Sequence, residues 1–247
     1  QSIGEVSHVS LVPTQLQRWF DYLVEHPQSI HTQAVLLGGT QIPVKLTQVL
    51  SELGIRSYSG YGMTEMASTV FAKQSDGKIG VGQSLLGRAF KLVNEEVWLK
   101  GAGLAMGYWR NGCVDPLTNA EGWFQTKDKG QWLDNELVIQ GRLDNMFISG
   151  GENIQPEEIE KVIAQSDLVK QVFVLPQHDE EFGHRPVAIV EFHTSFNESA
   201  VESLNVFLQG RLERFKQPVA YYELPQDLIQ GAIKISRKAL ADWLSQQ

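Results

Sequence analysis

Two short apolar runs that each end in glycine place the strongest constraint on the fold of this chain. "AVLLGG" (34–39) and "IRSYSGYG" (55–62) have the composition of strands, and "PVKLTQVLSELG" (43–54) has the apolar spacing of a helix. Pro43 suits the first helical position, and Gly54 suits the end of the helix. A strand, a helix and a strand in this order indicate a piece of parallel α/β sheet, whose ligands bind at the carboxyl ends of the strands.

Residues 79–143 have a different pattern, in which short runs of strand-forming residues alternate with turns rich in Asn, Asp and Gly. This pattern predicts a small antiparallel barrel or a twisted sheet. The candidate strands are 89–93, 95–100, 122–126, 130–133, 136–140 and, just beyond, 145–148.

The last hundred or so residues predict a separate α+β domain. Pro156 fits the first position of a helix, and the acidic residues after it favour the positive end of the helix dipole. Further expected elements are strands at 171–175, 186–193 and 219–223 and helices near 198–214 and 237–245.

These elements group into three parts. Before the first strand, Thr14 is expected to cap a helix over 15–25. The fold class is therefore α/β plus α+β, and the expected parts are 1–78, 79–143 and 144–247.

The composition excludes several classes of function. The formal net charge of −8 disfavours a nucleic-acid partner, since a phosphate backbone requires a basic face. No run of about 18 apolar residues is present, which argues against insertion into a membrane. The lone Cys113 rules out an internal disulfide and fits a cytoplasmic location. The chain begins with Gln1 rather than Met, so we expect it to begin inside a larger protein.

The first candidate for chemistry is "GYGMTE" (60–65), at the end of the second predicted strand. The hydroxyl of Thr64 and the carboxylate of Glu65 suit a phosphate oxygen and its Mg²⁺, which prefers one or two carboxylates plus substrate phosphates. The alternative is a plain helix start, with Thr64 as the cap and Glu65 in the first turn.

The second candidate is "GRLDNMFISGGENI" (141–154). Arg142 offers a planar fork for a phosphate or ribose oxygen, and the alternative is a surface turn with one ion pair. Gly150 and Gly151 are compatible with a plain loop or with a narrow ligand that passes against the backbone.

The third candidate is "GAIKISRKAL" (231–240), in which Lys234 stands between Ile233 and Ile235. A lysine near the start of an amphipathic helix is usually a solvated charge. The functional alternative is a mobile cation that meets negative charge developing on a phosphate.

Together, "GYGMTE", "GWFQTKD", "GRLDNMFISGGENIQPEEIE" and "IKISRKAL" resemble the ordered core motifs of the adenylate-forming, AMP-binding superfamily. That superfamily contains acyl- and aryl-CoA ligases, luciferases and peptide-synthetase adenylation domains. Within it, "SLVPTQLQRW" (10–19), "LLGGTQIP" (36–43) and "EFGHRPVAIVEF" (181–192) look like the bacterial o-succinylbenzoate–CoA ligases of menaquinone synthesis.

The resemblance implies a two-step reaction with ATP and CoA as co-substrates, Mg²⁺ as cofactor and a small aryl carboxylic acid as substrate. The acid attacks the α-phosphate of ATP to give acyl-AMP and pyrophosphate, and the CoA thiolate then displaces AMP. Two other hypotheses stay open: another aryl- or acyl-CoA ligase, and a non-catalytic nucleotide- or CoA-binding relative. A homo-oligomer also stays open.

The resemblance also implies roles for individual residues around the nucleotide. Gly38 and Gly39 would border the adenine and acyl pockets, and Tyr61 would lie beside adenine. Thr64 would contact the α-phosphate and Glu65 would hold Mg²⁺, so that both count as catalytic.

Further along the chain, the resemblance implies that Asp128 would bind the ribose hydroxyls and that Arg142 would contact ribose or phosphate. Asp144 would be the hinge between domains. Gly150 and Gly151 would line the path of the CoA pantetheine.

Lys234 matches the catalytic lysine of the first half-reaction. Adenylation brings an anionic carboxylate against an anionic phosphate, so a cation between them lowers the barrier most in the transition state. Ser68 and Thr69 are expected to bind the second carboxylate of a dicarboxylic aryl substrate.

The sequence departs from the family pattern in three places. Ile233 and Lys127 stand where the family usually has glycine, and the "SSGTTGxPK" loop that grips the β- and γ-phosphates does not occur. We therefore expect a carboxy-terminal portion that is inactive by itself. It would hold part of the large adenylation domain (1–78 and 79–143) and a complete, mobile small domain (144–247).

Overall fold

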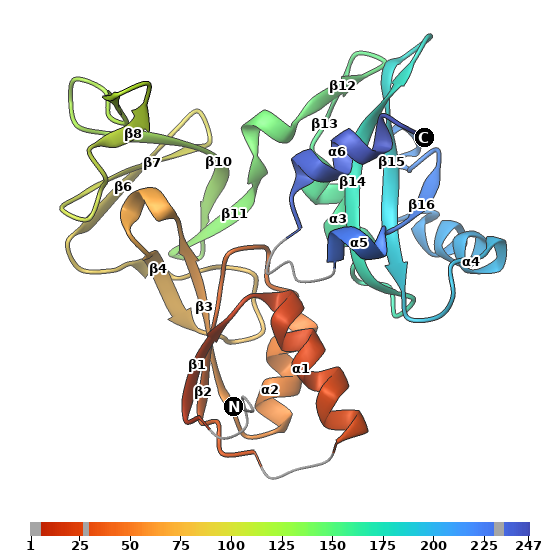
Figure 1. Cartoon of the computed structure of the whole chain (residues 1–247), viewed down its shortest axis with the longest axis horizontal. Coiled ribbons are helices and arrows are strands. Elements are labelled where there is room, and N and C mark those ends of the chain that lie inside the picture. Colours follow the sequence, from red (N-terminus) through yellow and green to blue (C-terminus); the bar gives the residue numbers. More distant parts are fainter. Residues whose placement is uncertain (1–5, 27–29, 230–234) are drawn as a thin grey trace. The chain divides into compact units, whose positions relative to one another are not determined.

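The computed structural model describes residues 6–26, 30–229 and 235–247. The chain divides into two compact units, Gln1–Ile139 and Gln140–Gln247. Figure 1 labels their elements in chain order. The three-part division expected from the sequence stays a prediction.

The first unit begins with a five-stranded sheet in the order β1-β2-β3-β4-β5 (Figure 1). β1, β2 and β3 are parallel, whereas β4 is antiparallel to β3 and β5 is antiparallel to β4. Helices α1 (Pro13–Glu25) and α2 (Val44–Glu52) connect the parallel strands. The predicted piece of parallel α/β sheet is confirmed, and β1 is an additional strand. The five strands are His8–Leu11, Ala34–Leu37, Arg56–Gly62, Thr69–Gln74 and Gln83–Ser84.

The start of α1 differs from the prediction. The expected cap at Thr14 is wrong, because the helix begins one residue earlier, at Pro13. The backbone N–H of Val12 donates to Oε1 of Gln15 over 3.0 Å, which satisfies one donor at the helix start. Proline has no N–H to satisfy at the first helical position, so Pro13 and Gln15 set this boundary.

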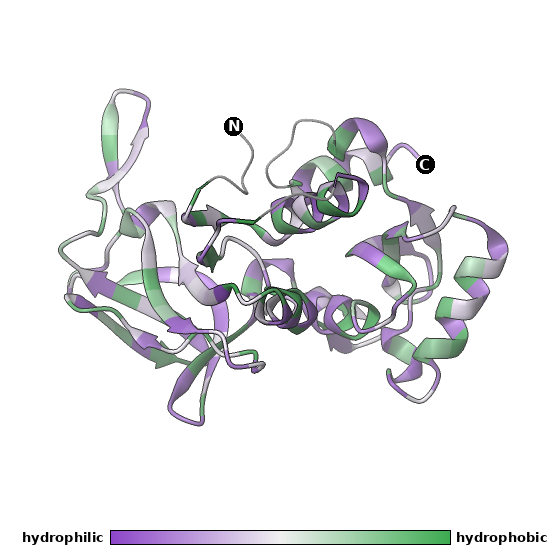
Figure 2. Ribbon diagram, turned by 90° about the horizontal axis from the view of Figure 1, so that it is seen from below, coloured by the Kyte–Doolittle hydropathy of each residue, from purple (hydrophilic) through white to green (hydrophobic). Residues whose placement is uncertain are grey.

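The apolar faces of α1 and α2 are buried against the parallel strands. Leu16 on α1, Leu50 on α2 and Leu37 on β2 are fully buried and belong to one cluster. Figure 2 shows green apolar residues interspersed with purple polar residues along the helical ribbons. This amphipathic pattern is the signal by which the sequence predicted both helices.

A second sheet, formed mainly by residues of the first unit, has the order β11-β10-β7-β6. β6 and β11 form its two edges, and a closed barrel needs its first and last strands to pair. The barrel expected for 79–143 is therefore corrected to the open sheet that was its alternative, as far as the described residues go. In chain order the strands are Arg88–Val93, Glu96–Gly101, Phe124–Leu133 and Glu136–Arg142.

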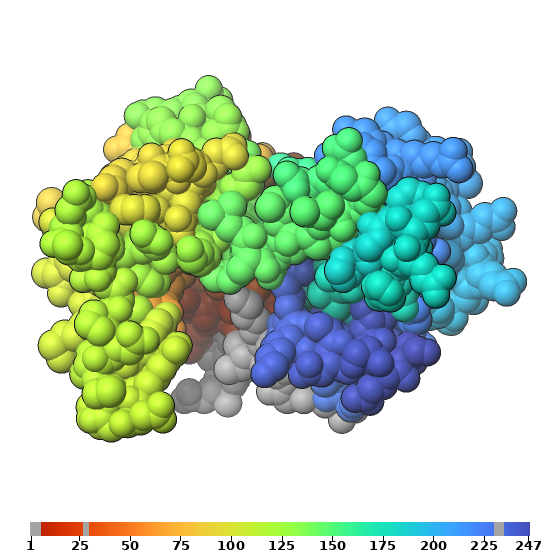
Figure 3. Space-filling view, turned by 90° about the horizontal axis from the view of Figure 1, so that it is seen from above, coloured from red at the N-terminus to blue at the C-terminus, as the bar shows by residue number. Residues whose placement is uncertain are grey.

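A separate hairpin of β8 (Gly107–Arg110) and β9 (Cys113–Pro116) completes the first unit. No local sequence pattern predicted this hairpin. Trp109 is 72% exposed, and Figure 3 shows the yellow-green atoms of this part of the chain as a projecting lobe.

The second unit is built on a three-stranded sheet in the order β14-β15-β16. β14 and β15 are antiparallel, and β15 and β16 are parallel. The predicted α+β class is confirmed. The elements are β12 (Phe147–Ser149), β13 (Glu152–Ile154), α3 (Pro156–Ile163), β14 (Val169–Asp179), β15 (Gly183–Phe192), α4 (Glu198–Leu208), β16 (Tyr221–Glu223), α5 (Gln226–Ile229) and α6 (Arg237–Leu244).

Both faces of this sheet are covered, as β15 shows. Residues 187–190 are buried one after another. Val190 belongs with Leu204 of α4 to one cluster, and Ile189 belongs with Leu240 of α6 to another. Successive side chains of a strand point to opposite faces, so a continuous buried run needs cover on both sides. Among the described residues, every helix is too short or too polar to cross a membrane.

Replacing Leu204 by alanine is expected to lower the free energy of unfolding by about 2–5 kcal/mol, because the side chain is fully buried and its removal leaves a cavity. Urea unfolding followed by circular dichroism measures the change. Val206 on the same helix is 60% exposed, and Val206→Ala should change the value by less than about 0.5 kcal/mol. Equal losses in the two variants would contradict the assigned face of α4.

Candidate functional site

The carboxyl ends of β2 and β3 bring several predicted residues together. Gly38 follows β2, and a Cβ atom there would lie 3.1 Å from the carbonyl oxygen of Gly60 on β3. A Cβ atom on Gly62 would lie 2.4 Å from the carbonyl oxygen of Ser68, which is closer than side chains allow. Only glycine therefore fits at 62, where the backbone of Ser68 and Thr69 runs against the end of β3.

The chain leaves β3 in a short 3-10 helix, η2 (Thr64–Met66). Met63 occupies the cap position and makes no side-chain cap hydrogen bond, so the interpretation of Thr64 as a helix cap is wrong. Met66 is fully buried and anchors the turn, whereas Glu65 is half-buried and Thr64 is exposed. The Thr64 hydroxyl is therefore held at an accessible surface.

The same edge presents other predicted residues to solvent. Gly39 is exposed and has a φ of +81° in the turn after β2. Ser68 is exposed and Thr69 is half-buried at the start of β4. A ligand at the ends of β2 and β3 can therefore reach all three residues.

Tyr61 and Asp128, which lie in different sheets of the first unit, are joined by a hydrogen bond. Tyr61 Oη donates to Asp128 Oδ2 over 2.6 Å. Asp128 is 8% exposed, and its backbone N–H donates to Oγ1 of Thr126, whose hydroxyl donates to the carbonyl of Val97. A buried carboxylate needs a donor, which Tyr61 supplies, and the bonds through Thr126 fix the backbone of Asp128. The two residues predicted for the nucleoside thus lie together.

The backbone conformation at Lys127 shows why the family usually has glycine at this position. It has a φ of +64°, a left-handed conformation that favours glycine, and it lies where the register of β10 on β7 shifts. Its backbone N–H donates to Oε1 of Glu96 over 2.9 Å. Glu96 is 9% exposed and also accepts from Nε1 of Trp98 over 3.0 Å. The lysine therefore keeps the bulge that a glycine would form, at a cost in backbone strain.

Lys127→Gly is expected to leave the free energy of unfolding unchanged or to raise it by up to about 1 kcal/mol, because relief of the left-handed strain opposes the added flexibility of glycine. Lys129 lies on the same strand, and its backbone does not have a positive φ. Lys129→Gly should therefore lower the free energy by roughly 0.5–1 kcal/mol. Urea unfolding of both variants tests this, and the same loss at both positions would contradict it.

Tyr108 on β8 is a site residue that the sequence analysis missed. Its hydroxyl donates to Oε1 of Glu65 over 2.5 Å, although 43 positions separate the two residues. The backbone N–H of Ala105 donates to the carbonyl of Glu65 over 2.7 Å. Glycines mark this part of the sequence, but no local pattern links it to Glu65, so only the fold reveals the contact.

The donor set at Glu65 fits one kind of metal site. Among the described residues, no group of three or more His, Cys, Asp or Glu side chains could hold a metal ion. Glu65 contributes a single carboxylate at an accessible edge. Mg²⁺ usually takes one or two carboxylates and completes its shell with water and substrate phosphates. The residues present therefore fit Mg²⁺ that arrives with a nucleotide.

In the second unit, Arg142 and Asp144 form a two-pronged ion pair. Arg142 Nε donates to Oδ1 of Asp144 over 2.8 Å, and Nη2 donates to Oδ2 over 2.9 Å. Both side chains are about half exposed, at 45% and 55%, so the pair contributes little to stability. The surface ion pair that the sequence analysis kept as an alternative for Arg142 is therefore present.

Gly150 and Gly151 form the turn between β12 and β13, with φ values of +58° and +89°. The N–H of Gly150 donates to the carbonyl of Phe182 over 3.0 Å, and a Cβ atom on Gly150 would lie 2.7 Å from the Phe182 ring. A side chain on Gly151 would meet no atom within 4 Å. The two glycines thus differ: the first is required by packing, and the second faces open space.

Lys234 and Ile233 lie outside the described residues. The next charged side chain along the chain is Arg237, at the start of α6. Its guanidinium donates to both oxygens of Glu160 on α3, over 2.5 and 2.6 Å, and to the carbonyl of Val174 over 2.9 Å. Burial raises the pKa of Glu160, against the opposing attraction of Arg237. The pair ties α6 to α3.

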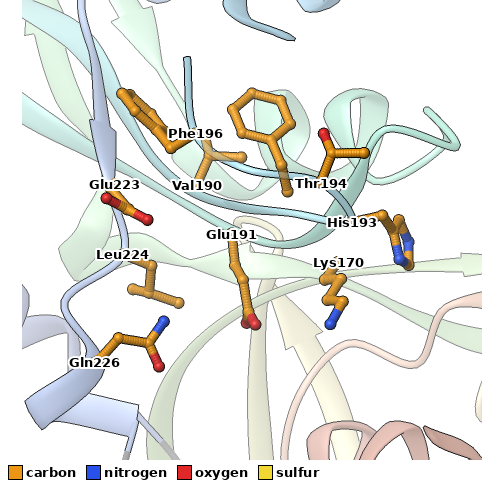
Figure 4. A pocket seen from close by; sticks show the side chains of 10 residues that line it. Lys170, Val190, Glu191, His193, Thr194, Phe196, Glu223, Leu224 and Gln226 are labelled. Atoms are coloured by element: carbon orange, nitrogen blue, oxygen red, sulfur yellow. The ribbon is translucent and has the colours of Figure 1, made fainter.

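A hollow of about 240 Å³ in the second unit is separate from every predicted residue. It lies at the ends of β15 and β16, where Figure 4 shows Glu191, Glu223 and Gln226 around it. Its charged side chains include Lys170, which is exposed. The hollow therefore adds nothing to the group of residues at the ends of β2 and β3.

Comparison with known proteins identifies the family. The model of the AMP-binding enzyme family matches residues 4–109. Over all 247 residues, the chain is 66% identical to 2-succinylbenzoate–CoA ligase from Haemophilus influenzae, of which it covers 54%. The chain belongs to the AMP-binding enzyme family.

Solved structures of this family have the same fold. A single-substitution variant of MenE from Escherichia coli with bound OSB-AMS is 51% identical, with a TM-score of 0.89 over 99% of this chain and 52% of that chain. O-succinylbenzoate coenzyme A synthetase (MenE) from Bacillus subtilis, in complex with ATP and magnesium ion, is 26% identical, with a TM-score of 0.72 over 89% of this chain and 48% of that chain. The chain spans about half the length of the curated relatives it matches.

Proposed function

We propose that this chain forms the carboxy-terminal half of an ATP-dependent acid–CoA ligase that acts on o-succinylbenzoate, also written 2-succinylbenzoate. One observation carries the proposal. Tyr61 is joined to Asp128 beside the exposed Thr64 and the half-buried Glu65, in a chain 66% identical to 2-succinylbenzoate–CoA ligase. These side chains offer an aromatic face, a carboxylate, a hydroxyl and a second carboxylate, which are the groups that adenine, ribose and phosphates require.

The proposed reaction has two steps. The carboxylate of the acid attacks the α-phosphorus of ATP, the bond to pyrophosphate breaks, and acyl-AMP forms. The CoA thiolate then attacks the acyl carbon, and AMP leaves with the electrons of the broken C–O bond. Tyr61 holds adenine and Asp128 accepts hydrogen bonds from the ribose hydroxyls, so the α-phosphate stays in one place through both steps.

Thr64 and Glu65 act on the phosphate side. The exposed Thr64 hydroxyl donates to the α-phosphate, where negative charge develops during the attack. Glu65 supplies the protein carboxylate for Mg²⁺, which when bound would neutralise phosphate charge. Arg142 adds a contact with ribose or phosphate once it exchanges its exposed partner Asp144 for the nucleotide.

The acid side of the site is formed by the segment that runs against Gly62. Ser68 and Thr69 donate hydrogen bonds to the second carboxylate of o-succinylbenzoate, and Gly38 and Gly39 border the acyl pocket. The exposure of Ser68 and its close approach to Gly62 support this assignment.

The second unit supplies the remaining groups. Lys234 is the cation that bridges the substrate carboxylate and the α-phosphate, and Asp144 is the hinge. Gly150 and Gly151 line the path of the pantetheine, for which the open space at Gly151 leaves room. An enzyme that consumes ATP and CoA in menaquinone synthesis is expected in the cytoplasm.

Ligase activity is tested in a chimera that places the amino-terminal half of the Haemophilus influenzae relative before this chain. The two carboxy-terminal halves are 66% identical, so most contacts between the halves are kept. We expect CoA-dependent AMP release with o-succinylbenzoate at a kcat/KM at least about tenfold above that for benzoate or acetate, because only the first acid offers a second carboxylate to Ser68 and Thr69.

Controls separate the alternatives. A preference for another acid would indicate a different aryl- or acyl-CoA ligase. A folded chimera that binds AMP but adenylates none of the acids, while the intact relative is active, would indicate a non-catalytic relative. The 247-residue chain alone is expected to give no ATP–pyrophosphate exchange, because it lacks the loop that grips the β- and γ-phosphates.

In the chimera, Lys234→Ala should lower the rate of adenylation by roughly 10²–10³-fold while changing ATP affinity little, because the cation acts mainly in the transition state. Lys238→Ala removes an exposed lysine four positions along the chain and should leave the rate within about twofold. Pre-steady-state formation of acyl-AMP and equilibrium binding of ATP measure the two effects. Equal effects of the two substitutions would contradict the assigned role.

A further inference from the structure

We propose that Tyr108 is a positioning residue that orients the Glu65 carboxylate toward the metal that accompanies the nucleotide. The inference rests on the proposed function, because it concerns the same site. It adds a role for the β8–β9 hairpin, to which the sequence analysis assigned none. The contact that motivates it is the 2.5 Å hydrogen bond from Tyr108 Oη to Oε1 of Glu65.

The segment before the hairpin already holds the η2 turn by its backbone. The N–H of Ala105 donates to the carbonyl of Glu65 over 2.7 Å. A Cβ atom on Gly103 would lie 3.3 Å from the carbonyl oxygen of Met66, so the two stretches are in close contact. Leu104 packs against the cluster that contains Met66. These contacts fix the backbone of η2, but they do not fix the direction of the Glu65 side chain.

Tyr108 is itself held in place. A Cβ atom on Gly107 would lie 2.2 Å from the carbonyl oxygen of Asp115, so only glycine lets β8 and β9 pair so closely at this point. The Arg110 guanidinium lies 5.4 Å from the centre of the Tyr108 ring, and Nη1 of Arg110 lies 3.8 Å from Oδ2 of Asp115. The ring is therefore contacted by Arg110 of its own strand, and Asp115 of the neighbouring strand holds Arg110, which favours one direction for the hydroxyl.

A carboxylate has two oxygens with room for about four hydrogen bonds or metal bonds. In the described part of the chain, Tyr108 is the side chain that donates to Glu65, and it uses Oε1. One rotamer of Glu65 is thereby selected, and Oε2 is the oxygen that a metal ion can take. Mg²⁺ demands near-ideal octahedral geometry, so a carboxylate with a fixed direction binds it better than a freely rotating one. Groups that orient metal ligands in this way change metal affinity by about 10–100-fold.

The test uses the active chimera with ATP and without the acid, so that no reaction follows. Mn²⁺ replaces Mg²⁺, and electron paramagnetic resonance measures its binding to the enzyme–ATP complex. Tyr108→Phe removes only the hydroxyl and should weaken Mn²⁺ binding by about 10–100-fold. AMP binds without the metal, and its affinity should change by less than about twofold. Trp109→Phe alters an exposed neighbour in the same hairpin and should change neither affinity.

A double-mutant cycle decides whether Tyr108 acts through Glu65. In a Glu65→Gln background the carboxylate is already gone, so Tyr108→Phe should weaken Mn²⁺ binding by less than about twofold further. Unchanged Mn²⁺ affinity in Tyr108→Phe alone, an equal loss in both backgrounds, or a parallel loss of AMP binding would each overturn the proposal. A parent chimera that neither binds Mn²⁺ with ATP nor adenylates o-succinylbenzoate would instead contradict the proposed function.

Discussion

The hydrogen bond from Tyr61 to Asp128 is the interaction on which the candidate site depends. Tyr61 lies near the end of β3 in the first sheet, and Asp128 lies on the bulged strand of the second sheet. A carboxylate that is 8% exposed is costly without partners, so the tyrosine hydroxyl stabilises it in its buried position, while the Thr126 hydroxyl accepts from the backbone N–H of Asp128 and fixes its backbone. The same contact joins two sheets and lies on the side of the site that we propose for the nucleoside. In that proposal, one interaction serves both stability and binding.

The side of the site that we propose for the phosphates is assembled in the same way, from segments far apart in the chain. Glu65 is reached by the hydroxyl of Tyr108 and by the backbone of Ala105, while the buried Met66 anchors the turn beneath them. In the second unit, Arg237 and Glu160 tie α6 to α3 immediately after the segment that contains Lys234. Polar contacts between distant segments thus fix the elements that border these two groups of candidate residues.

Much of the fold was predictable from local patterns. The two apolar runs with glycine at their ends and the amphipathic segment between them gave the parallel α/β piece, and Pro156 with its acidic neighbours gave the start of α3. Helix starts are not always this clear. At α1 the hydroxyl of Thr14 suggested a cap, but the helix begins at Pro13 and the Gln15 side chain accepts from the N–H of Val12. The motifs also gave the residue types of the site, because a hydroxyl, carboxylates and an arginine suit a nucleotide whatever their arrangement.

By itself, then, the sequence determined the fold class, the order of the motifs and the chemical character of the site. Only the tertiary structure decided that the four-stranded sheet within residues 79–143 is open, that Lys127 occupies a bulge, and that Tyr108 contacts Glu65. The reason is the distance along the sequence between the residues that interact. Helix and strand signals lie within a few neighbouring residues, whereas closure of a sheet, a shift in strand register and a hydrogen bond across 43 positions depend on which distant segments pair.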